Sequence, residues 1–151
     1  MPSRYRGTTD EVRALSALIT LMRAADAFSG SLARELSSKG LTGSQFGVLE
    51  ALLHRGPLFQ GDLAGKLLRS CGSITSVVGG LEKKGLVERR RDATDNRFVQ
   101  VSLTGKGRAL VGGLFPAHAR TVAAQFSALT PAETDQLRAL CRKLGTAVAR
   151  G

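Results

Sequence analysis

The chain has 151 residues, and its 22 Lys and Arg against 12 Asp and Glu give a formal net charge of +10 at pH 7. A chain of this length is expected to form a single domain over 1–151 with its own hydrophobic core. Two cysteines exclude a disulfide scaffold and are typical of a reducing compartment, so a cytoplasmic location is expected. The apolar stretches are short and interrupted and no secretory signal pattern is present, so no membrane partner is expected.

The positive charge is concentrated in the middle of the sequence. Residues 1–62 carry seven basic and six acidic residues, a net charge of +1. Residues 63–108 carry ten against four, a net charge of +6, and residues 109–151 carry five against two, a net charge of +3. A concentrated basic segment favours a polyanionic partner such as DNA. On charge alone, a solvated face in an arginine-rich protein is an equally good interpretation.

Helical periodicity predicts a long first helix. Thr8-x-x-Glu11 forms a capping-box start, the helix runs to about Ser38, and Gly40 provides a stop. The apolar stripe is long for a helix at the end of a chain, which indicates a partner helix. The stripe consists of Leu15, Leu18, Ile19, Met22, Ala25, Leu32 and Leu36.

Two more helices are predicted in the last third of the chain. Thr104 caps a helix that runs to about Ser127. The sequence Thr130-Pro131-Ala132-Glu133 then combines an N-cap, a proline at the first helical position and a capping-box glutamate. The helix that follows is expected to bury an apolar stripe formed by Leu137, Leu140, Cys141, Leu144 and Val148.

The middle of the chain predicts three shorter helices. A second capping box over 42–45 opens the first, which Gly56-Pro57 ends. The second spans about 61–68, and Ser70 caps a third that Gly85 closes. Because only three or four residues connect the last two, their spacing is that of a helix-turn-helix. The residues expected to face the core are Phe46, Leu49, Leu52, Leu53, Leu63, Ala64, Leu67, Ile74, Val77, Val78 and Leu81.

A β-hairpin is predicted directly after these helices. Residues 86–90 and 98–103 have strand-like patterns, and the turn formers of 92–96 lie between them. A helix-turn-helix followed by a hairpin is a winged helix, whose second helix enters the major groove of DNA while the hairpin reaches phosphates or the minor groove. The predicted fold class is mainly α with a small β-hairpin, a winged helix-turn-helix lobe over 42–103 flanked by helices over 8–40 and 104–149.

The candidate DNA-binding residues lie on the second helix of the helix-turn-helix and on the hairpin. Small and hydroxyl side chains on that helix permit close approach to phosphates and base edges. The neighbouring arginines make a merely polar helix face the less favoured interpretation. The candidates are Ser70, Gly72, Ser73, Thr75, Ser76, Lys83, Arg89, Arg90, Arg91, Asp95 and Arg97.

Several motifs resemble those of MarR-type transcriptional regulators. Asp95-x-Arg97-x-x-x-Val101-x-Leu103-Thr104-x-x-Gly107 is similar to the wing signature of that family. Leu81-Glu82-x-x-Gly85-Leu86-Val87 is similar to its junction between recognition helix and wing, and Leu41-Thr42-x-x-Gln45-Phe46 to its second helix. The resemblance covers nearly the whole chain, including Leu129-Thr130-Pro131.

The resemblance implies a repressor that binds a pseudo-palindromic operator in double-stranded DNA as a homodimer. The first and last helices would join the two copies, and their long apolar stripes agree with this role. Two-fold symmetry would place the recognition helices about one DNA turn apart, roughly 34–36 Å. Arg97 would enter a minor groove with Asp95 orienting it, and Arg89, Arg90 and Arg91 would lie near phosphates at the base of the wing.

Some positions depart from the family pattern. Family members commonly carry arginine where this chain has Cys71 and Ser76, so the base contacts of its recognition helix do not follow by analogy. Phe59 replaces the usual threonine cap of the third helix.

The resemblance also implies release of DNA by a small aromatic or lipophilic ligand or by an oxidant. Cys71 is the candidate redox residue, because a helix N-terminus and the nearby Arg69 favour the thiolate. The alternative is that Cys71 is only a small residue in a tight turn.

An enzyme is disfavoured, because the sequence contains no nucleotide-binding glycine loop, no metal-ligand spacing and no nucleophile elbow. No catalytic residue, metal or cofactor is therefore expected. The competing function is a basic architectural protein that binds DNA or RNA without sequence preference and loses affinity steeply with salt.

Overall fold

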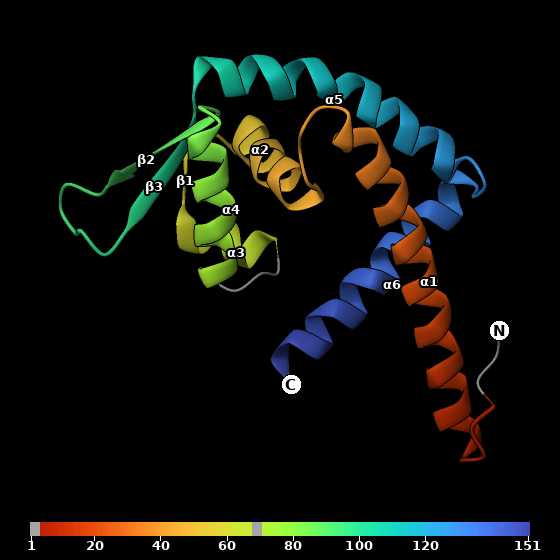
Figure 1. The fold of residues 1–151 in the computed structure, drawn as a ribbon. Coiled ribbons are helices and arrows are strands. Elements are labelled where there is room, and N and C mark those ends of the chain that lie inside the picture. Colours follow the sequence, from red (N-terminus) through yellow and green to blue (C-terminus); the bar gives the residue numbers. More distant parts are fainter. Residues whose placement is uncertain (1–3, 68–70) are drawn as a thin grey trace. The chain divides into compact units, whose positions relative to one another are not determined.

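A computed structural model of the chain describes residues 4–67 and 71–151, and for Cys71 and Gly72 it describes the backbone only (Figure 1). The chain divides into two compact units, one reaching to Arg108 and the other spanning Ala109–Gly151. Within the described ranges, no helix is both long enough and apolar enough to cross a bilayer.

The first unit contains the predicted helix-turn-helix and hairpin, so the predicted fold class is confirmed. In chain order its elements are α1 (Thr9–Ser37), α2 (Gly43–Arg55), β1 (Leu58–Phe59), α3 (Gln60–Lys66), α4 (Cys71–Lys83), β2 (Val87–Arg91) and β3 (Val99–Leu103). α5 (Gly105–Phe126) leads into the second unit, which also holds α6 (Pro131–Arg150).

The helix starts follow from local hydrogen bonding, as predicted. A capping box satisfies backbone N–H groups that have no partner within the first helical turn. In each case the threonine hydroxyl accepts from the N3 backbone, and the N3 side chain accepts from the threonine backbone. The three boxes are Thr8 with Glu11, Thr42 with Gln45, and Thr130 with Glu133.

The sequence did not predict the first strand, β1. β1 is only two residues long, directly after Gly56-Pro57, and it pairs antiparallel with β3 through Leu58 opposite Val101 and Phe59 opposite Gln100. The sheet therefore has three strands in the order β1-β3-β2, and the hairpin projects from it in Figure 1. A two-residue strand shows no measurable alternation in sequence, which is why the pattern did not reveal it.

The core of the first unit lies between α2, α3, α4 and the sheet. Most predicted core residues are buried there, but Leu53, Leu67 and Val77 are only half-buried, and Val48 is fully buried instead. The fully buried set includes Phe46, Leu49, Leu52, Leu63, Ile74, Val78, Leu81 and Val101.

The stripe predicted to be core on α6 is exposed in the single chain. α6 has no buried residue, Leu140 is 57% exposed and Val148 is 72% exposed. Cys141, which was predicted to lie in the same core, is also exposed. The periodicity correctly predicted an apolar face on α6, but within one copy of the chain this face remains exposed to solvent.

A tight backbone junction fixes the hairpin to its flanking helices. Gly85, at φ +73°, reverses the chain after α4, a conformation that glycine adopts without steric penalty. The Leu86 carbonyl then accepts from the Thr104 backbone N–H at 3.1 Å, and the Thr104 hydroxyl donates to the Gly85 carbonyl at 2.7 Å. The Thr104 hydroxyl also accepts from Gly107 at 3.0 Å, which caps α5.

This junction explains the glycine of the wing signature and generates a test. A Cβ on Gly107 would overlap the backbone carbonyl of Leu86, which cannot move without breaking its bond to Thr104. Gly107→Ala should therefore destabilise the fold by about 1–3 kcal/mol, the usual range for overpacking. The free energy of unfolding from denaturant titration measures this loss.

Gly105→Ala is the matched control, because a Cβ on Gly105 meets nothing within 4 Å. It should leave stability unchanged or raise it by up to ~1 kcal/mol through a less flexible unfolded chain. Equal stability of the two variants would contradict the steric account of Gly107.

Candidate nucleic-acid interface

The wing loop holds Arg97 in a fixed position. The Asp95 carboxylate accepts from the Arg97 backbone N–H at 3.0 Å, from Nε at 3.0 Å and from Nη2 at 2.6 Å. The Arg97 side chain is nevertheless 85% exposed. Asp95 thus engages one edge of the guanidinium, whose five N–H donors leave capacity for a further acceptor. The hydrogen bonds from Arg97 lower the pKa of Asp95 and raise that of Arg97 from their ordinary values.

Asp92 organises the same loop from its other side. Its Oδ2 accepts from the Thr94 hydroxyl at 2.5 Å and from the Asp95 backbone N–H at 3.1 Å. The Thr94 hydroxyl bond is the main cause that lowers the pKa of Asp92, followed by the Asp95 backbone bond. Since the folded pKa is depressed, this stabilisation is present above the ordinary Asp pKa and is lost only as pH falls through the lowered value. The loop therefore stays organised at neutral pH.

The three consecutive arginines have different environments. Arg89 donates to Glu82 at 2.9 Å, and this bond joins β2 to α4 and lowers the pKa of Glu82. Arg91 donates to the Asn96 carbonyl at 2.9 Å within the wing. Arg90 is exposed and lies opposite Gln100 in the sheet register. Two of the three guanidiniums thus also hold the wing together, although Arg91, like Arg90, is exposed.

The candidate residues of α4 form a polar face of short side chains. Thr75, Ser76 and Lys83 are exposed, and Ser73 is half-buried. The Thr75 hydroxyl accepts from Nε2 of Gln60, the first residue of α3, at 2.8 Å. This bond connects the two helices of the helix-turn-helix at the presented surface.

Some predicted residues cannot be assigned a place at this surface. Ser70 lies outside the described residues, as does Arg69, which the redox prediction invoked. Cys71 and Gly72 begin α4, and for these two residues only the backbone is described.

Sequence reasoning missed Gln60 and Glu82 as members of the site. Each contacts a residue on a different element, so the spacing along the chain carries no helical or strand period. A polar residue at the start of α3 and an acidic residue among basic ones were the only available signals. Phe59, which stands where the family usually has a threonine cap, makes no side-chain capping hydrogen bond to α3.

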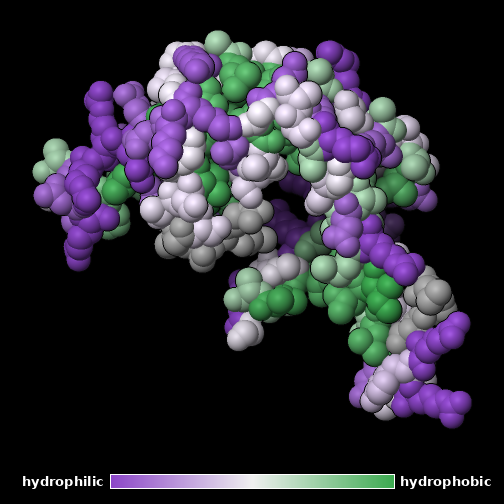
Figure 2. All heavy atoms as spheres, in the orientation of Figure 1, coloured by the Kyte–Doolittle hydropathy of each residue, from purple (hydrophilic) through white to green (hydrophobic). Residues whose placement is uncertain are grey.

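Together, the described parts of the wing and α4 present hydrogen-bond donors and positive charge beside an apolar core. Figure 2 shows the hairpin as a strongly hydrophilic projection. A planar guanidinium held at one edge suits bidentate contact with phosphate or base oxygens. Hydroxyl-bearing side chains on a helix suit close approach to a groove. This arrangement of donors and positive charge is best suited to binding a nucleic-acid backbone.

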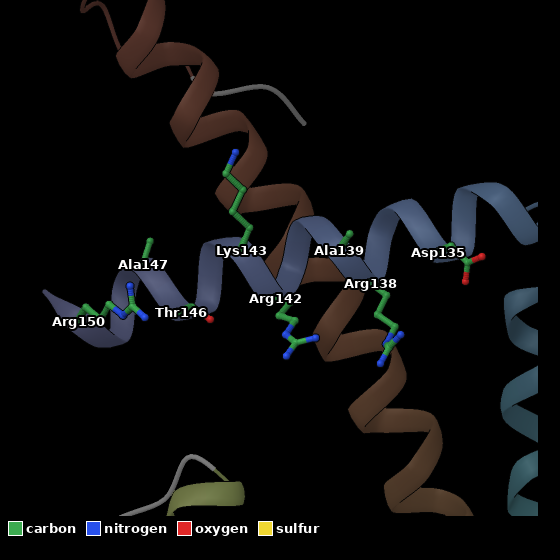
Figure 3. A pocket seen from close by; sticks show the side chains of 8 residues that line it. All are labelled: Asp135, Arg138, Ala139, Arg142, Lys143, Thr146, Ala147 and Arg150. Atoms are coloured by element: carbon green, nitrogen blue, oxygen red, sulfur yellow. The ribbon is translucent and has the colours of Figure 1, made fainter.

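A second cationic surface lies on α6, on the face opposite its leucines. Its side chains line a shallow pocket (Figure 3) that comprises Asp135, Arg138, Ala139, Arg142, Lys143, Thr146, Ala147 and Arg150. All of these residues come from one helix, so they form an open, solvated face and not a cleft. We assign no site to it.

Comparison with known proteins agrees with this geometry. A family model described as MarR family matches residues 39–97. The uncharacterized HTH-type transcriptional regulator YkoM of Bacillus subtilis is 35% identical over 133 residues, which cover 88% of this chain and 86% of that relative.

Two solved structures are similar in fold and in sequence. BpsR of Bordetella bronchiseptica, whose DNA binding is regulated by 6-hydroxynicotinic acid, is 29% identical with a TM-score of 0.77. The alignment covers 85% of this chain and 98% of BpsR. MepR of S. aureus, solved as a DNA complex, is 26% identical with a TM-score of 0.75, over 85% of this chain and 96% of MepR. The chain therefore belongs to the MarR family of winged-helix transcriptional regulators.

Proposed function

We propose that this protein is a repressor that binds pseudo-palindromic double-stranded DNA as a homodimer. The observation that carries the proposal is the Arg97 guanidinium, exposed at the wing yet held by Asp95, beside a helix-turn-helix. The similar MepR protein is known as a DNA complex, which supports DNA as the partner. Repression follows if the bound dimer blocks access of the polymerase to a promoter.

In this proposal each part of the lobe has its own task. Arg97 enters the minor groove, where positive side chains are attracted by the enhanced negative potential of narrow segments. Ser73, Thr75 and Ser76 approach base edges and phosphates in the major groove. Lys83 and Arg90 contact phosphates, which contribute affinity without sequence information.

A second copy of the chain would cover the apolar faces of the terminal helices. On α1, Leu18 and Met22 are each more than half exposed, and on α6 the same holds for Leu140, Leu144 and Val148. Figure 2 shows hydrophobic surface along α1 and, separately, on α6. Exposed apolar surface of this extent marks an interaction site. A two-fold dimer also supplies the pair of winged lobes that a pseudo-palindrome requires.

The DNA proposal is tested with duplexes recovered by in vitro selection on the full-length protein. The recovered sequences should contain a palindrome with half-sites one helical turn apart. Arg97→Ala should then weaken affinity roughly tenfold or more, since a specific contact is worth about 1–3 kcal/mol. Fluorescence anisotropy measures the affinity.

Arg13→Ala is the matched control, because Arg13 is also an exposed arginine paired with an aspartate, Asp10, at 3.0 Å on α1. It should leave DNA affinity unchanged. Equal competition by scrambled duplex at ~150 mM salt would reject the regulator in favour of a basic architectural protein. Unaltered affinity of Arg97→Ala would reject the wing contact alone.

The dimer proposal predicts that Leu144→Asp shifts the protein to monomer in sedimentation velocity, because a charge in a buried apolar interface is strongly unfavourable. Ala139→Asp places the same charge on the opposite, cationic face of α6 (Figure 3) and should leave the dimer intact. A Leu144→Asp protein that remains dimeric would exclude this face of α6 from the interface.

Regulation by a small aromatic or lipophilic ligand is part of the proposal, supported by the regulation of the similar BpsR. We expect a member of a panel of small aromatic acids to release the selected duplex in a gel shift. Oxidative release would act through Cys71, the first residue of α4. If peroxide releases DNA from the wild type and from Cys71→Ser alike, Cys71 has no redox role.

A further inference from the structure

Two aromatic rings on the first unit contact each other in a partly exposed position. The rings of Phe59 and Phe98 are tilted by 55°, with their centroids 5.7 Å apart. Phe59 is 36% exposed and Phe98 is 50% exposed. Tilted aromatic pairs at this distance are stabilised beyond the burial of their area. The contact joins the start of the helix-turn-helix to the wing.

The sheet register accounts for the contact. Phe59 in β1 lies opposite Gln100 in β3, and Phe98 precedes Gln100 by two residues. Phe98 lies one residue before β3 and continues its ladder, because its carbonyl accepts from the Asp92 backbone N–H. Residues two apart in such an extended segment share a face, so the two rings are diagonal neighbours, a separation that aromatic side chains bridge. Beyond Phe59, β1 has no further paired residue. The aromatic contact thus extends the link between β1 and β3 past their last backbone pair, towards the wing loop.

Phe98 also closes the loop that carries Arg97. Its backbone N–H donates to the Asp95 carbonyl at 3.1 Å, and its carbonyl accepts from the Asp92 backbone N–H at 2.9 Å. Within the loop, the Asp92 carboxylate accepts from Thr94 and from the Asp95 backbone, and the Asp95 carboxylate accepts from Arg97. These bonds tie Phe98 to the loop, so a shift of Phe98 would carry the loop with it.

Beyond β1, the outer part of the hairpin is a two-stranded ribbon, and the aromatic contact is what supports it from β1. Such ribbons are only marginally stable by themselves and twist more than wider sheets. Without the aromatic contact, the wing would sample a range of positions relative to α3 and α4, and docking Arg97 into DNA would require ordering it. Ordering a mobile segment on binding reduces affinity.

We propose that Phe59 and Phe98 are positioning residues that set the placement of the wing, and with it Arg97, relative to the helix-turn-helix. The inference rests on the proposed DNA-binding function and deepens it. The rings act through Arg97 and do not themselves contact DNA. Phe59, which replaces a helix cap, thereby gains a role that a threonine at the same position could not fill.

The test compares Phe59→Ala, Phe98→Ala and the double variant on the selected duplex, each in the full-length protein. Each single variant should bind about three- to tenfold more weakly, the range that the energy of an aromatic pair implies. The double variant should bind no more weakly than the weaker single variant. In an Arg97→Ala background, Phe98→Ala should have no further effect. In the otherwise wild-type protein, Phe98→Leu should retain part of the affinity that Phe98→Ala loses.

A Phe98→Ala loss that persists in the Phe59→Ala or Arg97→Ala background would overturn the proposal, because it would mean that Phe98 contacts DNA directly. Wild-type affinity in both single variants would also overturn it. Thermal melts verify that each variant is folded, which is expected because both rings are partly exposed.

A measurement without DNA separates this inference from the proposed function. In Phe59→Ala, hydrogen exchange at the Asp92 and Phe98 amides should be faster than in the wild type, while exchange in α2 stays unchanged. Unaltered exchange would reject the positioning role even if DNA binding is established. If exchange is faster in Phe59→Ala but the wild type binds all duplexes equally, the positioning role of the rings stands and the proposal of sequence-specific DNA binding is rejected.

Discussion

The winged helix-turn-helix lobe depends on one close backbone approach, between Leu86 at the end of the α4–β2 turn and Gly107 in the first turn of α5. The chain reverses at Gly85, and Thr104 ties both strands of the hairpin to that reversal through its backbone and its hydroxyl. Because both ends of the hairpin are fixed at the same junction, the hairpin and α4 start from one common point. α4 and the hairpin are therefore connected through this shared junction.

The net charge of the winged helix-turn-helix lobe does not show that several of its arginines are held by intramolecular bonds. Arg89 holds α4 to β2, Arg91 holds the wing loop, and Arg97 is paired with Asp95. Exposed ion pairs contribute little to global stability. Their effect is geometric, since they restrict long side chains before a partner arrives. Pre-organised groups lose less conformational entropy on binding.

The sequence carried the order of the elements because capping boxes, glycine stops and apolar periods are local signals. Thr42, Gly85 and Thr104 each mark a boundary within a residue or two of the observed one. Two kinds of feature could not be predicted from the sequence pattern. β1 is too short to show a period, and the partners Gln60–Thr75 and Glu82–Arg89 connect separate elements. The apolar face of α6 was predicted correctly, but its exposure depends on what lies outside one copy of the chain.

The Asp95–Arg97 pair also affects how the protein would search along DNA. A carboxylate and a guanidinium 2.6 Å apart carry no net charge, so from beyond about 10 Å, the screening length at ~0.1 M salt, a phosphate backbone experiences little attraction to the wing tip. The tip thus contributes little to the salt-dependent, sequence-independent affinity that holds a regulator on arbitrary duplex. Its attraction becomes strong only at contact, where the shape of the groove decides whether the guanidinium fits. In the proposed DNA-binding mode, pairing Arg97 with Asp95 would thereby favour residence at matching sites over residence on other duplex.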